Sequence, residues 1–372
     1  MKDLQSHITE IIKVKLNHKE RTAPLDYFSW GRDTRHMVDD TERLPGLTSQ
    51  KQFFIKVAKK CYYFMMEFIN SNKRIMSQYA ENYSSFNKSY QLMSDQYSRN
   101  LFAELILMKL TSEKKMYLDS FTQSFIDSYE NSSEEILNSN ESLEVYKWIL
   151  RKVNLDNPSI SLFTVPTILN LHHTGRLYRY KQDDVLIEVE GGDIVLDAGV
   201  GWGDTTIYLA AMANKNLGGH SYAFDILEEG INALSEQCNL NPEIDNITPV
   251  LKALSDKDGE HVNISSPSPG AKVVKEETER KIETISIDTF FKQNKLKIID
   301  FVKMDIEGAE VPALNGAAEV IKKFKPKLAI SVYHKWDDLL VIPQLIHSIR
   351  DDYEYYLDCT TGFGGETVLY CR

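Results

Sequence analysis

Apolar and polar positions divide the chain into two parts of different character. Residues 1–150 hold few glycines and repeat apolar positions at helical spacing, which predicts helices near 3–18, 50–70, 73–93, 95–111 and 114–128. Short apolar runs alternating with glycine turns follow, and they predict strands alternating with helices. We therefore expect an α/β fold, with an α-helical N-terminal domain over residues 1–150 and a sheet-containing domain over 151–372.

The segment IVLDAGVGWGDTTIYLA, residues 194–210, has the clearest local pattern. It begins with an apolar run typical of a buried strand and ends with a helical pattern. Gly199, Gly201 and Gly203 lie between the two, so the main chain can turn tightly and a ligand can approach the free N–H groups of the helix. A dinucleotide fingerprint needs a further glycine where this chain has Asp204, which disfavours a nicotinamide-dependent oxidoreductase, the second functional hypothesis.

Asp197 lies two positions before the first glycine, at the carboxyl end of the predicted strand. Its carboxylate repels a pyrophosphate and attracts an amine. Such a site suits a ligand with an adenosine end and a cationic amino-acid end, which describes S-adenosyl-L-methionine. The alternative is that Asp197 caps the helix and that the glycines only make a tight turn.

Polar residues also end the later strands. HSYAFD ends at Asp225, where a carboxylate can bind ribose hydroxyls, and NITPVLKALSD ends near Ala253–Asp256. IIDFVKMDIEGAE ends a fourth strand at Asp305, and KLAISVYHKW ends a fifth at His334. Ligands bind beyond the carboxyl ends of strands in an open α/β sheet, so we expect one shared crevice. The predicted cofactor-binding residues are Asp197, Gly199, Gly201, Gly203, Asp225, Ala253, Leu254 and Asp305.

Together these segments resemble the FkbM-type S-adenosylmethionine-dependent methyltransferases. The matching pieces follow the family's order across residues 185–372: VLDAGVGWGD, YAFD, ALSDKDG, ISIDTFF, VKMDIEGAEVPALNGA, AISVYH and ETVLY. Residues 92–110 show a weaker similarity, and Trp202 and Ile226 replace the family's common small residue and proline. The resemblance implies a Rossmann-like class I methyltransferase sheet of seven strands, mostly parallel with the last antiparallel. It also implies methyl transfer to a hydroxyl, and by analogy the acceptor is a carbohydrate or glycosylated metabolite.

Methyl transfer from a sulfonium needs an acceptor oxygen held in line at about 3 Å and shielded from water. A sugar hydroxyl is a poor nucleophile at neutral pH, so we expect a base or a metal to assist it. His334 is the first candidate for the base, and Asp305 is the second. A divalent metal held by Asp305, Glu307, Glu310 and His334 is a lesser alternative, because acidic residues in a first helical turn also stabilise the helix dipole. Lys303 shares a strand face with Asp305, so we expect a structural ion pair there rather than a catalytic role.

Composition narrows the choice of function. The chain has 43 Lys and Arg against 54 Asp and Glu, and its net charge of −11 argues against nucleic acid as the main partner. The four cysteines lack C-x-x-C spacing, so neither a zinc site nor a disulfide framework is expected. No apolar run approaches the length of a membrane span. We expect a cytoplasmic enzyme that acts on a small-molecule or glycan acceptor.

Several connections can also be predicted. The polar stretch 131–142 indicates a connection or exposed turns rather than core. FTVPTILN with RLYRYKQDDVLIEV, within 163–189, indicates a hairpin leading into the sheet. Residues 263–281 are rich in Ser, Pro and charge and predict a loop or mobile hairpin that covers substrate. YEYYLDCTT and ETVLYCR flank a glycine turn and predict a C-terminal hairpin.

A non-catalytic binding module is the third functional hypothesis. The polar residues kept at the strand ends disfavour it.

Overall fold

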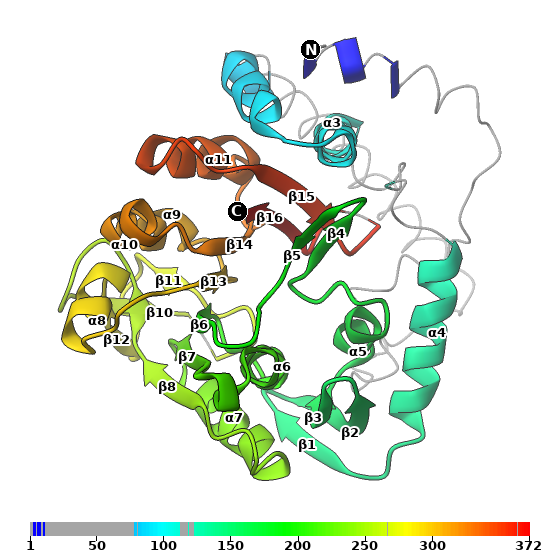
Figure 1. The fold of residues 1–372 in the computed structure, drawn as a ribbon, viewed down its shortest axis with the longest axis vertical. Helices are drawn as coiled ribbons and strands as arrows, with labels where there is room; N and C mark the ends of the chain where they lie inside the picture. The colour runs from blue at the N-terminus through cyan, green and yellow to red at the C-terminus, as the bar shows by residue number, and fades with distance from the viewer. Residues whose placement is uncertain are drawn as a thin grey trace, which may run out of the picture.

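The computed structural model gives the fold in Figure 1, and it describes residues 3–4, 6–8, 10–11, 78–79, 81–111, 118, 123–265, 267–362 and 364–372. The helix expected near 50–70 lies outside the described residues, as do parts of those near 3–18 and 73–93. The helix expected at 95–111 is confirmed as α3 (Gln96–Thr111).

Helix α4 (Gln123–Leu137) extends further than expected. It includes most of the polar stretch that the sequence indicated as a connection, so that interpretation was wrong. Ile136 is buried on its inner face, and the Ser132 hydroxyl donates to the Ser128 carbonyl one turn earlier. One buried apolar position and a satisfied hydroxyl therefore keep a polar sequence helical.

A seven-stranded sheet forms the centre of the molecule, in the order β15-β16-β14-β13-β6-β7-β8. Strands β6, β7, β8, β13 and β14 run parallel, and β16 is antiparallel to both β14 and β15, as expected for the last strand. The predicted C-terminal hairpin is therefore confirmed. The strands are β6 (Ile194–Ala198), β7 (His220–Asp225), β8 (Ile247–Leu251), β13 (Phe301–Met304), β14 (Lys327–Ser331), β15 (Tyr355–Cys359) and β16 (Thr367–Cys371).

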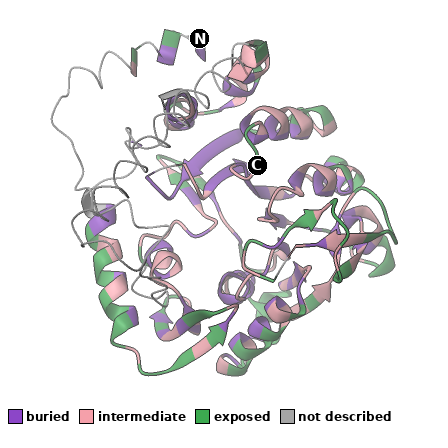
Figure 2. Ribbon diagram, turned by 180° about the vertical axis from the view of Figure 1, so that it is seen from behind, coloured by how far each residue is buried: buried purple, intermediate pink, exposed green. Residues whose placement is uncertain are grey.

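Helices cover both faces of this sheet, because successive strand residues point to opposite sides. Leu196 and Val302 pack into one apolar cluster with α3 and with α8 (Ile287–Gln293), α9 (Glu310–Asn315), α10 (Ala318–Phe324) and α11 (Asp338–Ile349). Val195 and Phe301 pack on the other face against α6 (Asp204–Ala213). Helix α7 (Glu228–Leu240) lies on this second side, and the 3-10 helix η3 (Lys215–Leu217) follows α6. Figure 2 shows the buried strands and the exposed outer faces of the helices.

A small sheet precedes the central one and consists of β1 (Ser142–Val145), β2 (Trp148–Asp156) and β3 (Ser159–Thr164). The expected domain boundary at residue 150 falls within β2, and the division into domains 1–150 and 151–372 stays a prediction. FTVPTILN does not join a hairpin, because Pro166 begins helix α5 (Pro166–His173). RLYRYKQDDVLIEV does form the expected hairpin, with β4 (Tyr180–Gln182) and β5 (Val185–Ile187).

The segment between the third and fourth central strands forms a second small sheet. Its strands are β9 (Ala253–Leu254), β10 (His261–Ile264), β11 (Val273–Val274) and β12 (Lys281–Ile285). Strands β10 and β11 are antiparallel, so the segment 263–281 contains a hairpin, as expected.

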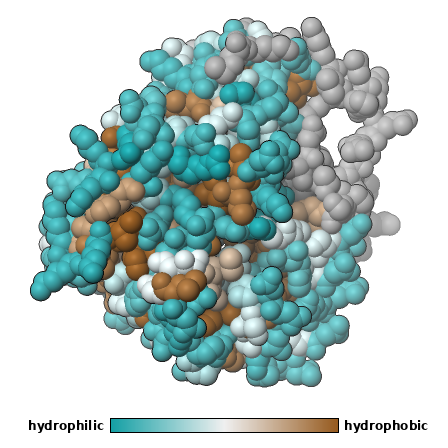
Figure 3. All heavy atoms as spheres, viewed as in Figure 1, coloured by the Kyte–Doolittle hydropathy of each residue, from teal (hydrophilic) through white to brown (hydrophobic). Residues whose placement is uncertain are grey.

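The molecular surface in Figure 3 is mostly hydrophilic, with apolar residues in separate groups. Within the described part of the chain, no helix is long and apolar enough to cross a membrane.

Candidate active site

A buried ion pair lies beneath the glycine loop, between β6 and β13. Lys303 Nζ lies 3.0 Å from Asp197 Oδ1, and the side chains are 3% and 0% exposed. Thr206 donates to the other Asp197 oxygen at 2.6 Å, and Lys303 also donates to the Gly199 carbonyl. Lys303 therefore forms a structural ion pair, as expected, but its partner is Asp197 of β6 and not Asp305, with which the sequence pattern had placed it. Because Asp197 is enclosed and already paired, this geometry gives it a role in holding the loop.

The three glycines of the loop have two different structural roles. Gly199 has a φ of +90°, and a Cβ there would lie 1.9 Å from the Asp305 carbonyl oxygen. At Gly203, with a φ of +81°, a Cβ would lie 2.7 Å from the Leu234 Cα. These two positions need glycine for close backbone packing. A Cβ on Gly201 would meet nothing within 4 Å, so this part of the loop faces open space.

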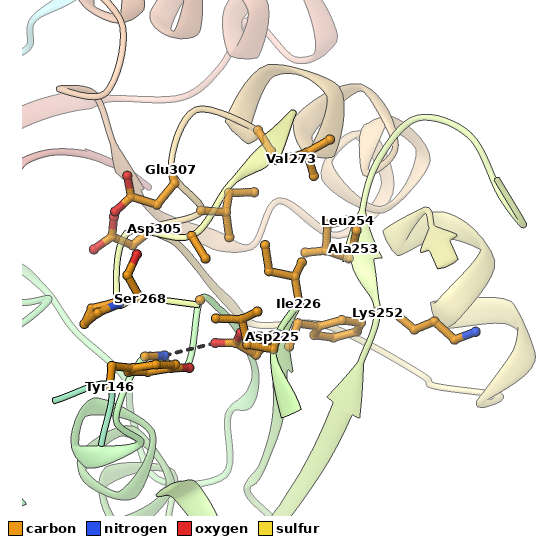
Figure 4. A pocket seen from close by; sticks show the side chains of 18 residues that line it. Tyr146, Asp225, Ile226, Lys252, Ala253, Leu254, Ser268, Val273, Asp305 and Glu307 are labelled. Carbon is orange, nitrogen blue, oxygen red and sulfur yellow. Dashed lines mark hydrogen bonds between the residues drawn. The ribbon is translucent and has the colours of Figure 1, made fainter. Parts of the chain in front are cut away.

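A pocket lies at the carboxyl ends of the central strands, as Figure 4 shows. It encloses about 780 Å³ of space, counting the part open to solvent. Of the predicted site residues it includes Gly199, Gly201, Asp225, Ala253, Leu254, Asp305 and Glu307. The predicted residues that do not line it are Asp197, Gly203, Glu310 and His334. Four further lining residues belong to the segment 263–281 that was expected to cover substrate: Ser268, Pro269, Ala271 and Val273. The other lining residues were not predicted as site residues: Tyr146, Phe224, Ile226, Leu227, Lys252, Ile306 and Ala309.

Asp225 ends β7 and is fixed by two backbone amides. The Gly201 N–H donates to Oδ2 at 3.1 Å, and the Leu227 N–H donates to Oδ1 at 2.8 Å. Burial raises the pKa of the Asp225 carboxyl, and the backbone amides oppose that rise. The side chain is therefore held in one orientation at the pocket wall, with lone pairs left for a ligand.

His334 lies between carboxylates rather than at the pocket surface. Its Nδ1 lies 2.9 Å from Glu310 Oε1, its Nε2 lies 3.2 Å from Asp305 Oδ1, and the side chain is 6% exposed. Burial acts to lower the pKa of His334, but the bonds to Asp305 and Glu310 outweigh it and raise the pKa to about 10. An imidazolium cannot accept a proton, so at neutral pH this geometry favours a charge-balancing role. The catalytic role of His334 as a base stays a prediction.

Asp305 is the most heavily bonded carboxylate of the pocket. Tyr178 donates to Oδ2 at 2.9 Å, and His334 lies against Oδ1. Burial acts to raise the pKa of Asp305, but His334 and the nearby Lys303 outweigh it and hold the pKa far below its usual value. Asp305 is therefore ionised at neutral pH and can accept a hydrogen bond from a ligand.

The two glutamates that follow Asp305 differ in position. Glu310 is 1% exposed, and its Oε1 accepts the backbone N–H groups of Ile306 and Gly308 as well as His334. Glu307 lines the pocket with a φ of +54°, and burial raises the pKa of its carboxyl. Among the described residues, no group of three or more His, Cys, Asp or Glu side chains is arranged to hold a metal ion. Both ring nitrogens of His334 instead face carboxylates.

A tyrosine and a glutamate extend this network away from the pocket. The Tyr333 hydroxyl lies 3.3 Å from both Asp305 Oδ1 and Glu366 Oε1. Burial, with the nearby charge of Asp305, raises the pKa of Glu366 to about 7. Glu366 belongs to the ETVLY piece quoted above, so its motif was visible in the sequence, although its proximity to Asp305 was not.

The strand order, with β16 antiparallel in a parallel sheet, defines a class I methyltransferase fold. Residues 193–355 match the family model described as methyltransferase FkbM domain. This match confirms the resemblance to the FkbM methyltransferases drawn from the motifs of the chain.

One solved structure is similar over most of the chain, and others are similar over about half of it. The crystal structure of methyltransferase FkbM from Methylobacillus flagellatus KT is similar with a TM-score of 0.50 and 19% identity, covering 80% of this chain and 60% of that chain. A putative rRNA-methylase from Clostridium thermocellum has a TM-score of 0.33 at 15% identity, covering 50% of this chain and 87% of that chain. Aeropyrum pernix fibrillarin, in complex with S-adenosyl-L-methionine, has a TM-score of 0.32 at 11% identity, covering 50% and 69%. The comparison with curated proteins found no match.

Proposed function

We propose that this chain transfers a methyl group from S-adenosyl-L-methionine to a hydroxyl group of a carbohydrate or glycosylated metabolite. The FkbM domain supports methyl transfer, and the pocket at the strand ends supports a nucleoside-type cofactor. The observation that carries the cofactor assignment is Asp225, which the Gly201 and Leu227 amides hold at the end of β7. A carboxylate at this position of an α/β sheet suits the hydroxyls of a ribose.

The pocket walls fit the rest of that cofactor. Apolar side chains of Phe224, Ile226 and Leu254 lie next to Asp225 and offer a surface for adenine. The open backbone at Gly201 leaves room for a ligand against the loop, and the carboxylates of Asp305 and Glu307 attract its cationic end. When bound, the cofactor supplies an electrophilic methyl group on a sulfonium. The protein's own contribution is then to bind, orient and exclude water.

Asp305 is the residue that we propose accepts a hydrogen bond from the acceptor hydroxyl. The Asp305 carboxylate already contacts Tyr178, Tyr333 and His334. These contacts fix its position before the acceptor binds. The hydroxyl loses a proton during transfer, and Glu366 has a pKa near neutrality and is linked to Asp305 through Tyr333. Glu366 is thus the group best suited to hold that proton. A divalent metal is not needed in this scheme.

Ligand binding to the purified full chain tests the cofactor. S-adenosylhomocysteine at a hundred times its dissociation constant should stabilise the protein by roughly 2.7 kcal/mol, and NAD should not. The Asp225→Ala variant should lose this stabilisation, whereas Asp256→Ala, which changes an exposed aspartate outside the pocket lining, should keep it. Stabilisation by NAD alone would support the oxidoreductase alternative and refute the proposal.

The acceptor class needs a separate experiment. Radiolabelled methyl groups from S-adenosyl-L-methionine, supplied with the protein and fractionated cell extract, should enter the glycan and small-metabolite fractions. The linkage should survive mild base that hydrolyses methyl esters, because an ether bond is stable there. Label found only in protein or nucleic acid would contradict the proposed acceptor while leaving the cofactor assignment intact.

A further inference from the structure

Tyr146 reaches the cofactor pocket from outside the FkbM domain. It lies at the tip of the β1–β2 hairpin, 47 positions before the family match begins at residue 193, and it lines the pocket. Tyr146 and Lys147 have φ values of 52° and 70°, between the paired residues Val145 and Trp148. Two consecutive left-handed residues make the tight turn that suits a two-residue hairpin, although side chains other than glycine resist that conformation.

Packing from two sides holds this turn in place. Val145 and Leu150 of the hairpin form a buried cluster with Ala233 of α7, and both Tyr146 and Trp202 of the glycine loop pack against this cluster. The rings of Trp148 and Trp202 lie 5.6 Å apart. Trp202 is the residue that departs from the smaller side chain common in the family, and here it gives the hairpin a surface to dock on.

Tyr146 also contacts the insertion between the third and fourth central strands. It packs beside Leu227, Ile264 and Ala271, and Ala271 lines the pocket as well. The hairpin and the insertion, which lie far apart in the sequence, therefore meet at this ring. The Tyr146 ring therefore forms part of the pocket wall, and it lies outside the segments that match the FkbM motifs.

The Tyr146 hydroxyl lies beside the acidic side of the pocket. Figure 4 shows the ring next to the bond between Gly201 and Asp225, with the hydroxyl end toward Asp225. Burial, followed by the charges of Asp225 and Glu229, raises the pKa of Tyr146, so the hydroxyl stays protonated. Among the described residues, none forms a hydrogen bond with it. A donor thus lies next to the carboxylate acceptor, and this pair complements a vicinal diol.

We propose that Tyr146 is a cofactor-binding residue that closes the nucleoside pocket and donates a hydrogen bond to a ribose hydroxyl bound at Asp225. This inference rests on the proposed function, because it takes S-adenosyl-L-methionine as the ligand. It makes the small sheet β1–β3 part of the cofactor site rather than a separate module.

Isothermal titration of the full chain with S-adenosylhomocysteine tests this role. Tyr146→Phe should weaken binding about three- to tenfold, the usual effect of one uncharged hydrogen bond, and Tyr146→Ala about ten- to a hundredfold, because the ring wall is lost as well. Lys147→Ala, an exposed neighbour in the same turn, is the matched control and should bind like the wild type. The 2′,3′-dideoxy analogue of the ligand should bind Tyr146→Phe and the wild type with similar affinity.

The outcomes separate the two proposals. Failure of the wild type to bind S-adenosylhomocysteine contradicts the proposed function itself. Tight binding by the wild type with unchanged affinity in Tyr146→Phe and Tyr146→Ala overturns the role of Tyr146 alone. Equal weakening in Lys147→Ala also overturns it, because the turn and not the side chain would then be responsible. If Tyr146→Ala fails to fold by circular dichroism, Tyr146→Phe decides.

Discussion

Replacing His334 with Gln should expose how strongly its charge stabilises the fold. His334 lies 2.9 Å from Glu310 and 3.2 Å from Asp305, with its side chain 6% exposed. Glutamine keeps a donor for one carboxylate but removes the positive charge. The two carboxylates would then be buried side by side without their shared counterion, apart from the more distant Lys303.

The size of the effect follows from two independent arguments. The pKa of His334 rises from 6.5 to about 10, and at 1.36 kcal/mol per pH unit this corresponds to an upper limit of roughly 5 kcal/mol. Removing one partner of a buried ion pair costs about 3–5 kcal/mol in other proteins. We therefore expect the free energy of unfolding at pH 7 to fall by roughly 3–5 kcal/mol.

The raised pKa of His334 also determines how the free energy of unfolding changes with pH. Because the folded-state pKa of His334 is raised, its contribution is fully present below pH 6.5 and is lost as the pH rises to about 10. The raised pKa of Glu366 also makes stability fall with rising pH, but only between about 4.5 and 7. Between pH 8 and 10 the buried thiols of Cys359 and Cys371, whose pKa values burial raises, lower stability in both proteins, so the difference between the wild type and His334→Gln reports His334.

Urea unfolding followed by circular dichroism at pH 6, 8 and 10 measures these changes. The wild type should lose stability between pH 8 and 10, and His334→Gln should lose much less. His261→Gln, at an exposed position in β10, is the control and should behave like the wild type. A loss below 1 kcal/mol at pH 7, or parallel pH curves for the wild type and His334→Gln, would refute the charge-balancing role.

Three further predictions concern the loop, the buried pair and the proton acceptor. Gly199→Ala should lower the melting temperature far more than Gly218→Ala, because both residues have φ near +90° but only the first Cβ meets a backbone oxygen, at 1.9 Å. Lys303→Met should destabilise by roughly 3–5 kcal/mol in urea unfolding, and adding Asp197→Asn should recover part of this loss; no recovery would argue against the ion pair. Glu366→Gln should lower kcat by about 10²–10⁴ and abolish the rise in rate around pH 7, with the Kd for S-adenosylhomocysteine unchanged; an intact pH profile would exclude Glu366 as the proton acceptor.

The positions of the parallel strands along the chain could be predicted because each of these strands carries its own local signal. Apolar runs ending in Asp225, Asp305 or His334 mark both a buried strand and the edge where parallel strands end. The glycine spacing likewise indicated a tight turn of the main chain after β6, and Gly199 has a φ of +90° there. These features depend on residues that are close together in the sequence, so they can be predicted from it.

The charge states and contacts of the site residues could not be predicted from the sequence in this way. Whether His334 is a base depends on Glu310, whose carboxylate turns back to it from the start of α9. Asp197 was expected to face a ligand, but its orientation depends on Lys303, across a strand pairing that no local pattern specifies. Tyr146 gave no signal, since its place in the pocket arises only when the hairpin docks on Trp202. Such facts depend on tertiary structure.

The meeting of Tyr146, Trp202 and Ala271 also limits how this chain can be recombined with its relatives. Tyr146 belongs to one apolar cluster with Trp202 and to another with Ala271, although the three residues come from separate segments of the chain. In an evolutionary lineage they should change in concert. A chimera that takes its first 165 residues from another enzyme would need the donor's counterparts at 202 and 271 before it could hold a nucleoside.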